Sequence, residues 1–186
     1  MVSTSDFKTG LTIEYNGNIY QIIEFQHVKP GKGSAFVRTK LRNLRANSVI
    51  DITFNSGEKF NKAQIDKDIM QFLYSYDETY VFMNNETYEQ VEMHESSLQK
   101  EKNYISEGMN INMISYDTEI LGIELPDKVT LTIEQTAGGA RGNTASNATK
   151  EALTSTGLKL SVPLFINEGD KIVVSTATGK YDTRAK

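Results

Sequence analysis

The sequence of 186 residues has no cysteine and no tryptophan, and it contains only two histidines and three prolines. The absence of cysteine excludes a disulfide framework, a thiolate metal site and a Cys nucleophile, and it suits a reducing compartment. No apolar run approaches the length of a membrane span, and the opening residues "MVSTSDFKTG" lack the apolar core of a secretory signal. With 38% hydrophobic residues, we expect a folded cytoplasmic protein with no membrane partner.

Charge is distributed unevenly along the chain. Residues 1–64 carry nine Lys or Arg and five Asp or Glu, residues 65–127 carry three and fourteen, and residues 128–186 carry eight and five. The net charges of +4, −11 and +3 predict a chain whose two ends, but not its middle, face a polyanion.

The basic excess is greatest in "KPGKGSAFVRTKLRNLR", residues 29–45, which has six Lys or Arg and no Asp or Glu. A solvated strand face is one interpretation of this run. Its coincidence with a Gly-rich turn favours a surface that binds RNA phosphates, because phosphate contacts supply most of the affinity in such interfaces. The candidate phosphate contacts are Lys29, Arg38, Lys40, Arg42 and Arg45.

Alternation with a period of two residues predicts strands through most of the chain. In "LTIEYNGNIYQIIEF" two β-rich runs are joined by Asn16-Gly17-Asn18, the composition of a tight hairpin turn. In the next strand the alternation puts Ala35, Val37, Thr39 and Leu41 on one face and Arg38, Lys40 and Arg42 on the other. The segment "KPGKG" is therefore expected to be the loop between two neighbouring strands.

The remaining pattern predicts an all-β protein. One short helix is expected from Ser96 or Ser97 to the stop at Gly108, and Pro126 marks a linker within an otherwise continuous strand pattern. Turn signals every eight to twelve residues are typical of small β-barrels. We expect three domains, at residues 1–64, 65–127 and 128–186.

Several kinds of chemistry find no support in the sequence. The nucleotide-binding P-loop requires Ser or Thr directly after its Gly-Lys pair, and Gly33 stands there instead. His27 is interpreted as a packed strand residue or as a group that stacks on or bonds a nucleotide, and His94 as simply exposed. We expect the acidic residues of the middle domain to be a solvated face, so the chain is predicted to be neither an enzyme nor a metal protein.

Two long motifs are recognisable: "FQHVKPGKGSAFVRTKLRNLR", residues 25–45, and "KEALTSTGLKLSVPLFINEG", residues 150–169. They closely resemble bacterial elongation factor P, and the resemblance covers the whole chain. It implies an SH3-like (KOW-like) barrel followed by two OB-folds in an elongated L-shape. It also implies a cytoplasmic monomer without a cofactor, which binds both ribosomal subunits beside the P-site peptidyl-tRNA. Members of the family promote peptide-bond formation at consecutive prolines by positioning the tRNA acceptor end.

The resemblance also assigns roles to the first loop. Lys32 is the residue that reaches toward the acceptor end of the peptidyl-tRNA, and it commonly carries a covalent extension added by a modifying enzyme. The effector loop around it comprises Lys29, Pro30, Gly31 and Gly33. Glycines beside Lys32 remove side-chain bulk, and Pro30 limits the conformations of the loop.

Further RNA contacts are implied near the C-terminus. The segment "GNTASNATK", residues 142–150, resembles the family's loop beside the small subunit and the E-site codon, although Asn143 and Ser146-Asn147 depart from the usual pattern; an ordinary mobile hairpin loop is the alternative. Tyr181 and Arg184 match a Tyr-x-x-Arg element that supports tRNA binding, with a frayed tail as the alternative. We interpret Val162, Pro163 and Phe165 as barrel packing. The RNA-binding candidates in this part of the chain are Gly142, Asn143, Thr144, Lys150, Tyr181 and Arg184.

Two other functions remain as alternatives. One is a non-enzymatic RNA-binding paralogue with the same fold and another target. The other is an enzyme that uses the acidic middle domain, for which no catalytic spacing is present.

Overall fold

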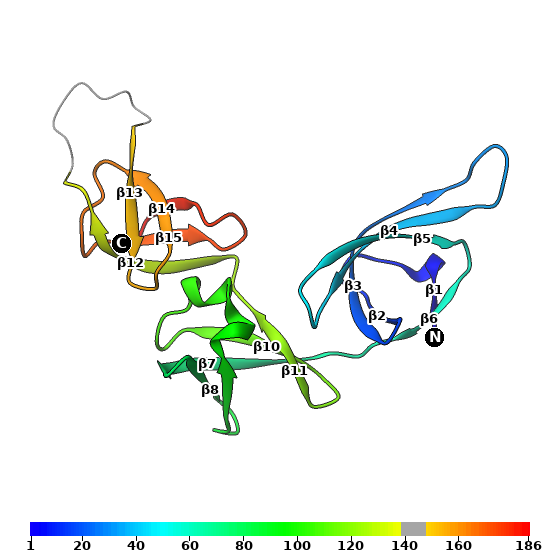
Figure 1. Ribbon diagram of the computed structural model, residues 1–186, viewed down its shortest axis with the longest axis horizontal. Coiled ribbons are helices and arrows are strands. Elements are labelled where there is room, and N and C mark those ends of the chain that lie inside the picture. Colours follow the sequence, from blue (N-terminus) through cyan, green and yellow to red (C-terminus); the bar gives the residue numbers. More distant parts are fainter. Residues whose placement is uncertain (139–147) are drawn as a thin grey trace. The chain divides into compact units, whose positions relative to one another are not determined.

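The computed structural model describes residues 1–138 and 148–186, which form three antiparallel β-sheets with short 3₁₀ helices as the only helical elements. Each sheet is curled (Figure 1), and each contributes buried apolar side chains. The all-β fold class predicted from the sequence is confirmed.

The first sheet has the strand order β1-β6-β2-β3-β4-β5, and we refer to it and its core as the first barrel. Buried residues from all along this sheet form one cluster that includes Ile13, Ile22, Val37, Leu41 and Phe54. The 3₁₀ helix η1 (Thr4–Asp6) follows the first strand. The strands are β1 (Val2–Ser3), β6 (Lys59–Lys62), β2 (Thr12–Tyr15), β3 (Asn18–Val28), β4 (Phe36–Asn43) and β5 (Val49–Asn55).

The tight hairpin predicted at Asn16-Gly17-Asn18 is confirmed. Asn16 and Gly17 have φ angles of +48° and +74° between β2 and β3. Two consecutive positive φ angles define a type I′ turn, whose twist matches that of the flanking strands.

The second sheet has the order β11-β10-β7-β8-β9. Its buried side chains include Phe72, Phe82, Leu98 and Ile111. The strands are β7 (Asp66–Tyr76), β8 (Thr79–Asn84), β9 (Gln90–His94), β10 (Asn110–Tyr116) and β11 (Glu119–Glu124).

The single helix predicted between Ser96 or Ser97 and Gly108 is wrong, because two 3₁₀ helices, η2 (Glu95–Leu98) and η3 (Glu101–Tyr104), occupy this region. His94 is exposed, as predicted, and its side chain also caps η2 by accepting a hydrogen bond from the backbone N–H of Ser96. The chain becomes extended at Ile105 (φ −101°, ψ 120°), which buries this side chain in place of a further helical turn.

The third sheet has the order β14-β13-β12-β15-β16. Its core contains Leu131, Val162, Ile166 and Ile172, against which Tyr104 and Met109 also pack. The strands are β14 (Lys159–Pro163), β13 (Thr149–Thr154), β12 (Lys128–Thr136), β15 (Lys171–Ser175) and β16 (Tyr181–Arg184).

The three sheets are distributed over two compact units. One consists of residues 1–67 and 113–122, and the other of residues 68–112 and 123–186. The division into three domains with boundaries at 64 and 127 stays a prediction.

Candidate nucleic-acid interface

The predicted effector loop connects β3 to β4 at the end of a hairpin that extends beyond the rest of the first sheet (Figure 1). Lys29, Gly31, Lys32 and Gly33 are exposed, and Pro30 is half-buried. The structure therefore brings the predicted loop residues together at one exposed tip.

The two glycines that flank Lys32 have different conformations. Gly33 has a φ of +102°, in the region that side chains disfavour, whereas the φ of Gly31 lies outside that region. A Cβ atom built on Gly31 would meet no heavy atom within 4 Å. The fold thus requires glycine at position 33, and nothing within the described chain requires it at position 31.

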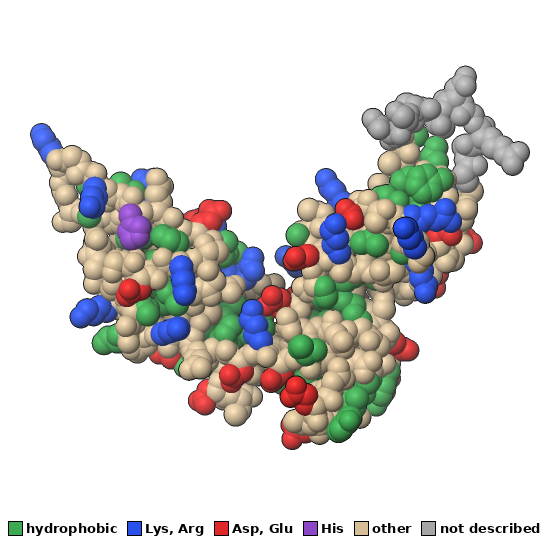
Figure 2. All heavy atoms as spheres, turned by 180° about the vertical axis from the view of Figure 1, so that it is seen from behind, with side chains coloured by type: hydrophobic (Ala, Val, Ile, Leu, Met, Phe, Trp, Pro, Cys, Tyr) green, Lys and Arg blue, Asp and Glu red, His purple; other side chains and the backbone are tan. Residues whose placement is uncertain are grey.

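The predicted alternation along β4 is confirmed. Val37, Thr39 and Leu41 are buried, with exposed fractions of 0 to 2%. Arg38 and Arg42 are exposed and Lys40 is half-buried on the opposite face. Figure 2 shows Lys and Arg side chains gathered over the first barrel, on the left of the view.

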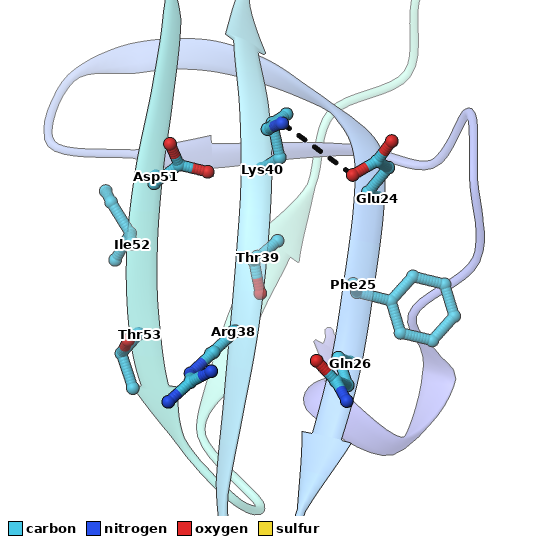
Figure 3. A pocket seen from close by; sticks show the side chains of 9 residues that line it. All are labelled: Glu24, Phe25, Gln26, Arg38, Thr39, Lys40, Asp51, Ile52 and Thr53. Carbon is cyan, nitrogen blue, oxygen red and sulfur yellow. Dashed lines mark ion pairs between the residues drawn. The ribbon is translucent and has the colours of Figure 1, made fainter.

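A shallow hollow of about 620 Å³ crosses β3, β4 and β5 on this barrel (Figure 3). Cross-strand pairing arranges its lining in rows, and Lys40 stands in one row between Glu24 and Asp51. Its Nζ lies 3.7 Å from a carboxylate oxygen of Glu24. The hollow is lined by Glu24, Phe25, Gln26, Arg38, Thr39, Lys40, Asp51, Ile52 and Thr53.

Arg38 has a less acidic setting than Lys40. Its cross-strand neighbours are Gln26 and Thr53, and its guanidinium carbon lies 5.6 Å from the ring centroid of Phe36. A phosphate that approaches Lys40 must compete with Glu24, whereas no carboxylate stands beside Arg38 in its row. We therefore rank Arg38 above Lys40 as a phosphate contact.

His27 lies one residue before the end of β3 and is exposed, so the interpretation as a packed strand residue is wrong. The rings of His27 and Phe25 make a T-shaped contact with a centroid distance of 5.7 Å. The other prediction, that His27 stacks on or bonds a nucleotide, is compatible with this exposure.

Arg45 lies apart from the other basic candidates, in the turn after β4. Its guanidinium makes two hydrogen bonds to the carboxylate of Glu119, and the bonded carboxylate raises the pKa of Arg45. The basic run read from the sequence is therefore split in space between the face of β4 and this turn.

The C-terminal candidates lie on or beside the third sheet. Lys150 is half-buried, and its ammonium donates to the carbonyl oxygen of Ala137. Tyr181 packs against the core of the third sheet, and burial raises the pKa of its hydroxyl group. Nη2 of Arg184 lies 3.3 Å from Oδ1 of Asp170. Tyr181 and Arg184 both belong to β16, so the alternative of a frayed tail is wrong. Gly142, Asn143 and Thr144, together with Ser146 and Asn147, lie outside the described residues.

Phe165 is an exposed aromatic side chain that the sequence reasoning assigned to the barrel core. Val162 and Ile166 are fully buried, whereas Phe165 is 57% exposed. The N–H of Ile166 donates to the carbonyl of Pro163, so a turn directs Phe165 outward. The prediction that Phe165 packs the barrel is wrong; the turn-forming Pro163 was the available signal.

Among residues 1–138 and 148–186, no group of three or more His, Cys, Asp or Glu side chains could hold a metal ion. Within the same ranges, no helix is long and apolar enough to cross a membrane.

Comparison with known proteins gives matches along nearly the whole chain. Family models described as the elongation factor P KOW-like domain, OB domain and C-terminal domain match residues 3–60, 65–123 and 129–184. The curated elongation factor P of Phytoplasma australiense is 55% identical over 185 residues, which cover 99% of this chain and 98% of that protein.

Two solved structures of other factors are also similar. Eukaryotic translation initiation factor 5A from Methanococcus jannaschii has a TM-score of 0.49 and 20% identity, over 65% of this chain and 95% of that one. A translation initiation factor eIF-5A family protein from Naegleria fowleri has a TM-score of 0.47 and 16% identity, over 67% and 96%. On the three family models and the 55% identical relative, the chain belongs to the elongation factor P family of translation elongation factors.

Proposed function

We propose that the chain binds the ribosome beside the P-site peptidyl-tRNA and stimulates peptide-bond formation at consecutive prolines. The observation that carries the proposal is the exposed Lys32 at the tip of the β3–β4 hairpin, with a glycine on each side. Membership of the elongation factor P family supports it. In this proposal Lys32 reaches the tRNA acceptor end in the peptidyl transferase centre.

The loop suits entry into a narrow RNA channel. Gly31 and Gly33 add no side-chain bulk, and Pro30 has a fixed φ that limits the conformations of the tip. Behind the tip, Arg38, Lys40 and Arg42 lie on one face of β4 and neutralise phosphates of tRNA or rRNA. The strand that follows the loop thus has a positive charge, which favours the same RNA partner that the loop contacts.

The proposed mechanism is catalysis by positioning. Proline is a poor substrate because its ring constrains the backbone and its amine is secondary, so the reactants are misplaced. Holding the acceptor end in a near-attack geometry recovers much of the barrier without an acid or a base from the protein. The ribosome is then the enzyme, and the chain itself is not.

Lys32 is also the proposed site of a covalent extension, added by a separate modifying enzyme. An extension would lengthen the reach of the side chain beyond the glycine-flanked tip. No cofactor is needed in this proposal. Mass spectrometry of the residue-32 peptide from the native host tests it, and an unmodified lysine mass would remove the extension while leaving the positioning role.

The C-terminal part is proposed to contact RNA as well. Tyr181 and Arg184 support tRNA binding from β16, and the segment 142–150 lies near the small subunit and the E-site codon. The proposed protein is a monomer of three domains, bounded near residues 64 and 127, that acts in the cytoplasm. Arg184 must exchange Asp170 for a phosphate to make such a contact.

Translation of reporters with and without a Pro-Pro-Pro stretch tests the proposed function. We expect the full chain to stimulate only the proline reporter, and Lys32→Ala to lose most of that stimulation. Lys59→Ala, which removes an exposed lysine from β6, is the matched control and should behave as wild type. Equal stimulation by wild type and Lys32→Ala would disprove the role of Lys32. RNA binding by a wild type that relieves no stalling would instead favour a paralogue with another target.

A further inference from the structure

Arg45 lies at the end of the first barrel opposite the Lys32 loop. β4 begins at Phe36, just after that loop, and ends at Asn43, just before the turn that contains Arg45. Seven residue steps along a strand separate these ends by roughly 23 Å. Arg45 therefore lies at the far end of β4 from the loop that carries Lys32.

Three donor groups of Arg45 are used within the protein. Nε donates to Oε1 of Glu119 at 3.1 Å, and Nη2 donates to Oε2 of the same carboxylate at 3.0 Å. Nη1 donates to the carbonyl oxygen of Gly17, in the β2–β3 turn, at 2.9 Å. Two parallel bonds to one carboxylate are the strong and directional form of an Arg ion pair. Arg45 therefore joins two barrel turns to the start of β11.

The turn that carries Arg45 is itself fixed. The side-chain oxygen of Asn43 accepts hydrogen bonds from the N–H groups of Arg45 and Ala46, at 2.9 and 3.1 Å. Asn43 is only 8% exposed. Because its amide is buried and doubly bonded, the direction of the Arg45 backbone is set by the barrel core.

A second contact joins the same two elements. The hydroxyl of Tyr116, at the end of β10, donates to the carboxylate of Glu14 on β2. This hydrogen bond is the main cause of the raised pKa of Tyr116. Tyr116 and Glu119 flank Asp117 and Thr118, whose φ angles of +48° and +69° make a tight turn. Both sides of the β10–β11 hairpin tip are thus tied to the barrel within one compact unit.

We propose that Arg45 and Glu14 are positioning residues that fasten the first barrel to the β10–β11 hairpin tip. In this role Arg45 is not a phosphate contact, contrary to the expectation from the basic run. The barrel and the hairpin tip form one body, from which the Lys32 loop is presented. The inference rests on the proposed function for its consequence in translation, but the contacts themselves can be tested separately.

The geometry favours this role over RNA binding. A phosphate that binds the Nε–Nη2 fork of Arg45 would have to displace the carboxylate of Glu119, which already occupies that fork. An isolated exposed ion pair contributes little, since the side chains of Arg45 and Glu119 are 36% and 50% exposed. Here the hydrogen bond from Arg45 to Gly17 and the Tyr116–Glu14 contact reinforce the ion pair. Four side chains, those of Arg45, Glu119, Tyr116 and Glu14, therefore act together.

A charge swap in the full chain separates the two roles of Arg45. We expect Arg45→Glu and Glu119→Arg each to lower stimulation of the Pro-Pro-Pro reporter roughly threefold to tenfold. In the double variant, stimulation of the reporter should recover to within about threefold of wild type. The swapped side chains can again form an ion pair between positions 45 and 119, but the hydrogen bond to Gly17 is not restored. A phosphate-binding Arg45 predicts the opposite: Glu119→Arg would be harmless and the double variant as poor as Arg45→Glu. Arg42→Glu, which lies on the phosphate-binding face, should not be rescued by Glu119→Arg.

Hydrogen exchange gives a readout that does not depend on translation. Amides of residues 113–122 should exchange faster than in wild type in Arg45→Glu and in Tyr116→Phe. In the double variant Arg45→Glu/Glu119→Arg, their exchange rates should return toward those of wild type. Unchanged exchange in both single variants would overturn the proposal. If Arg45→Glu fails to fold, Arg45→Gln and Glu119→Gln replace the single variants with the same expectations. If wild type relieves no stalling, the proposed function fails while the exchange experiment still decides the role of Arg45.

Discussion

The glycines on either side of Lys32 contribute different things to the effector loop. Gly33 adopts a φ of +102°, which an L-residue with a Cβ reaches only with strain. Gly31 has no such conformation and no close neighbour. A requirement for glycine at position 31 would therefore come from a partner molecule and not from the fold.

Alanine substitutions at the two positions test this difference. We expect Gly33→Ala to lower the free energy of unfolding by about 1 kcal/mol, because of backbone strain. Gly31→Ala should leave it unchanged, yet reduce stimulation of the Pro-Pro-Pro reporter, because its methyl group adds bulk to the tip. Chemical denaturation and the reporter assay measure the two effects. Full activity of Gly31→Ala would show that the channel does not require a bare tip.

At the scale of single residues, sequence reasoning found the loop and the face of β4 but not the partners of its cations. The alternation of "FVRTKLRN" is enough to place Arg38, Lys40 and Arg42 together. That Glu24 stands beside Lys40 depends on the β3–β4 register, which shifts by one residue between Ile22 and Glu24. Such a bulge leaves no clear mark in the sequence, so the ion pair could not be predicted.

The strand β4 is the element on which RNA affinity is expected to depend. Its three cations share one face, while the opposite face is buried in the barrel core. Cations that replace counterions on RNA make the affinity dependent on salt, whatever the RNA sequence.

Replacing the three cations of β4 by glutamine tests this dependence. The magnitude of the slope of log affinity against log salt should fall by roughly 0.7 to 0.9 for each phosphate contact that is lost, the values for single strands and duplexes. Arg38→Gln should have a larger effect than Lys40→Gln, since Lys40 lies between Glu24 and Asp51. Binding of structured RNA measured between low and high salt gives these slopes. The double variant Lys59→Gln/Lys62→Gln, on exposed positions of β6, is the control; equal losses in control and test variants would indicate nonspecific attraction only.

Element boundaries were predictable where a turn has its own chemistry, as at Asn16-Gly17. They failed at residues 95–108, where the polar residues Ser96 and Ser97 signal a helix start but η2 begins at Glu95 and is capped by His94. The helix was also expected to continue, yet burial of Ile105 extends the chain there. Tertiary packing overrode local preference in this segment.

At the scale of the whole molecule, residues next to the second sheet contact the third sheet, and the sequence does not reveal these contacts. Tyr104 and Met109, from the middle of the chain, pack against the core of the third sheet. Thr156 Oγ1 donates to the carbonyl oxygen of Asn103 at 2.5 Å. In the sequence, Pro126 indicated a linker between these two parts of the chain, but it carries no information about a contact between residues 53 positions apart.

A cavity in the core of the third sheet tests whether residues 101–109 and the third sheet unfold as one cooperative unit. Ile172 is fully buried, so Ile172→Ala should cost roughly 2–4 kcal/mol. If η3 opens together with the third sheet, amides of residues 101–109 should lose protection along with those of β12 and β15, because both then exchange through the same opening. Lys171→Ala changes an exposed neighbour on the same strand and should leave protection unchanged.

Independent domains divided at residue 127 predict instead that residues 101–109 keep their protection in Ile172→Ala. Hydrogen exchange resolved by residue distinguishes these outcomes, and retained protection would mean that the contacts of Tyr104 and Met109 contribute little to cooperativity.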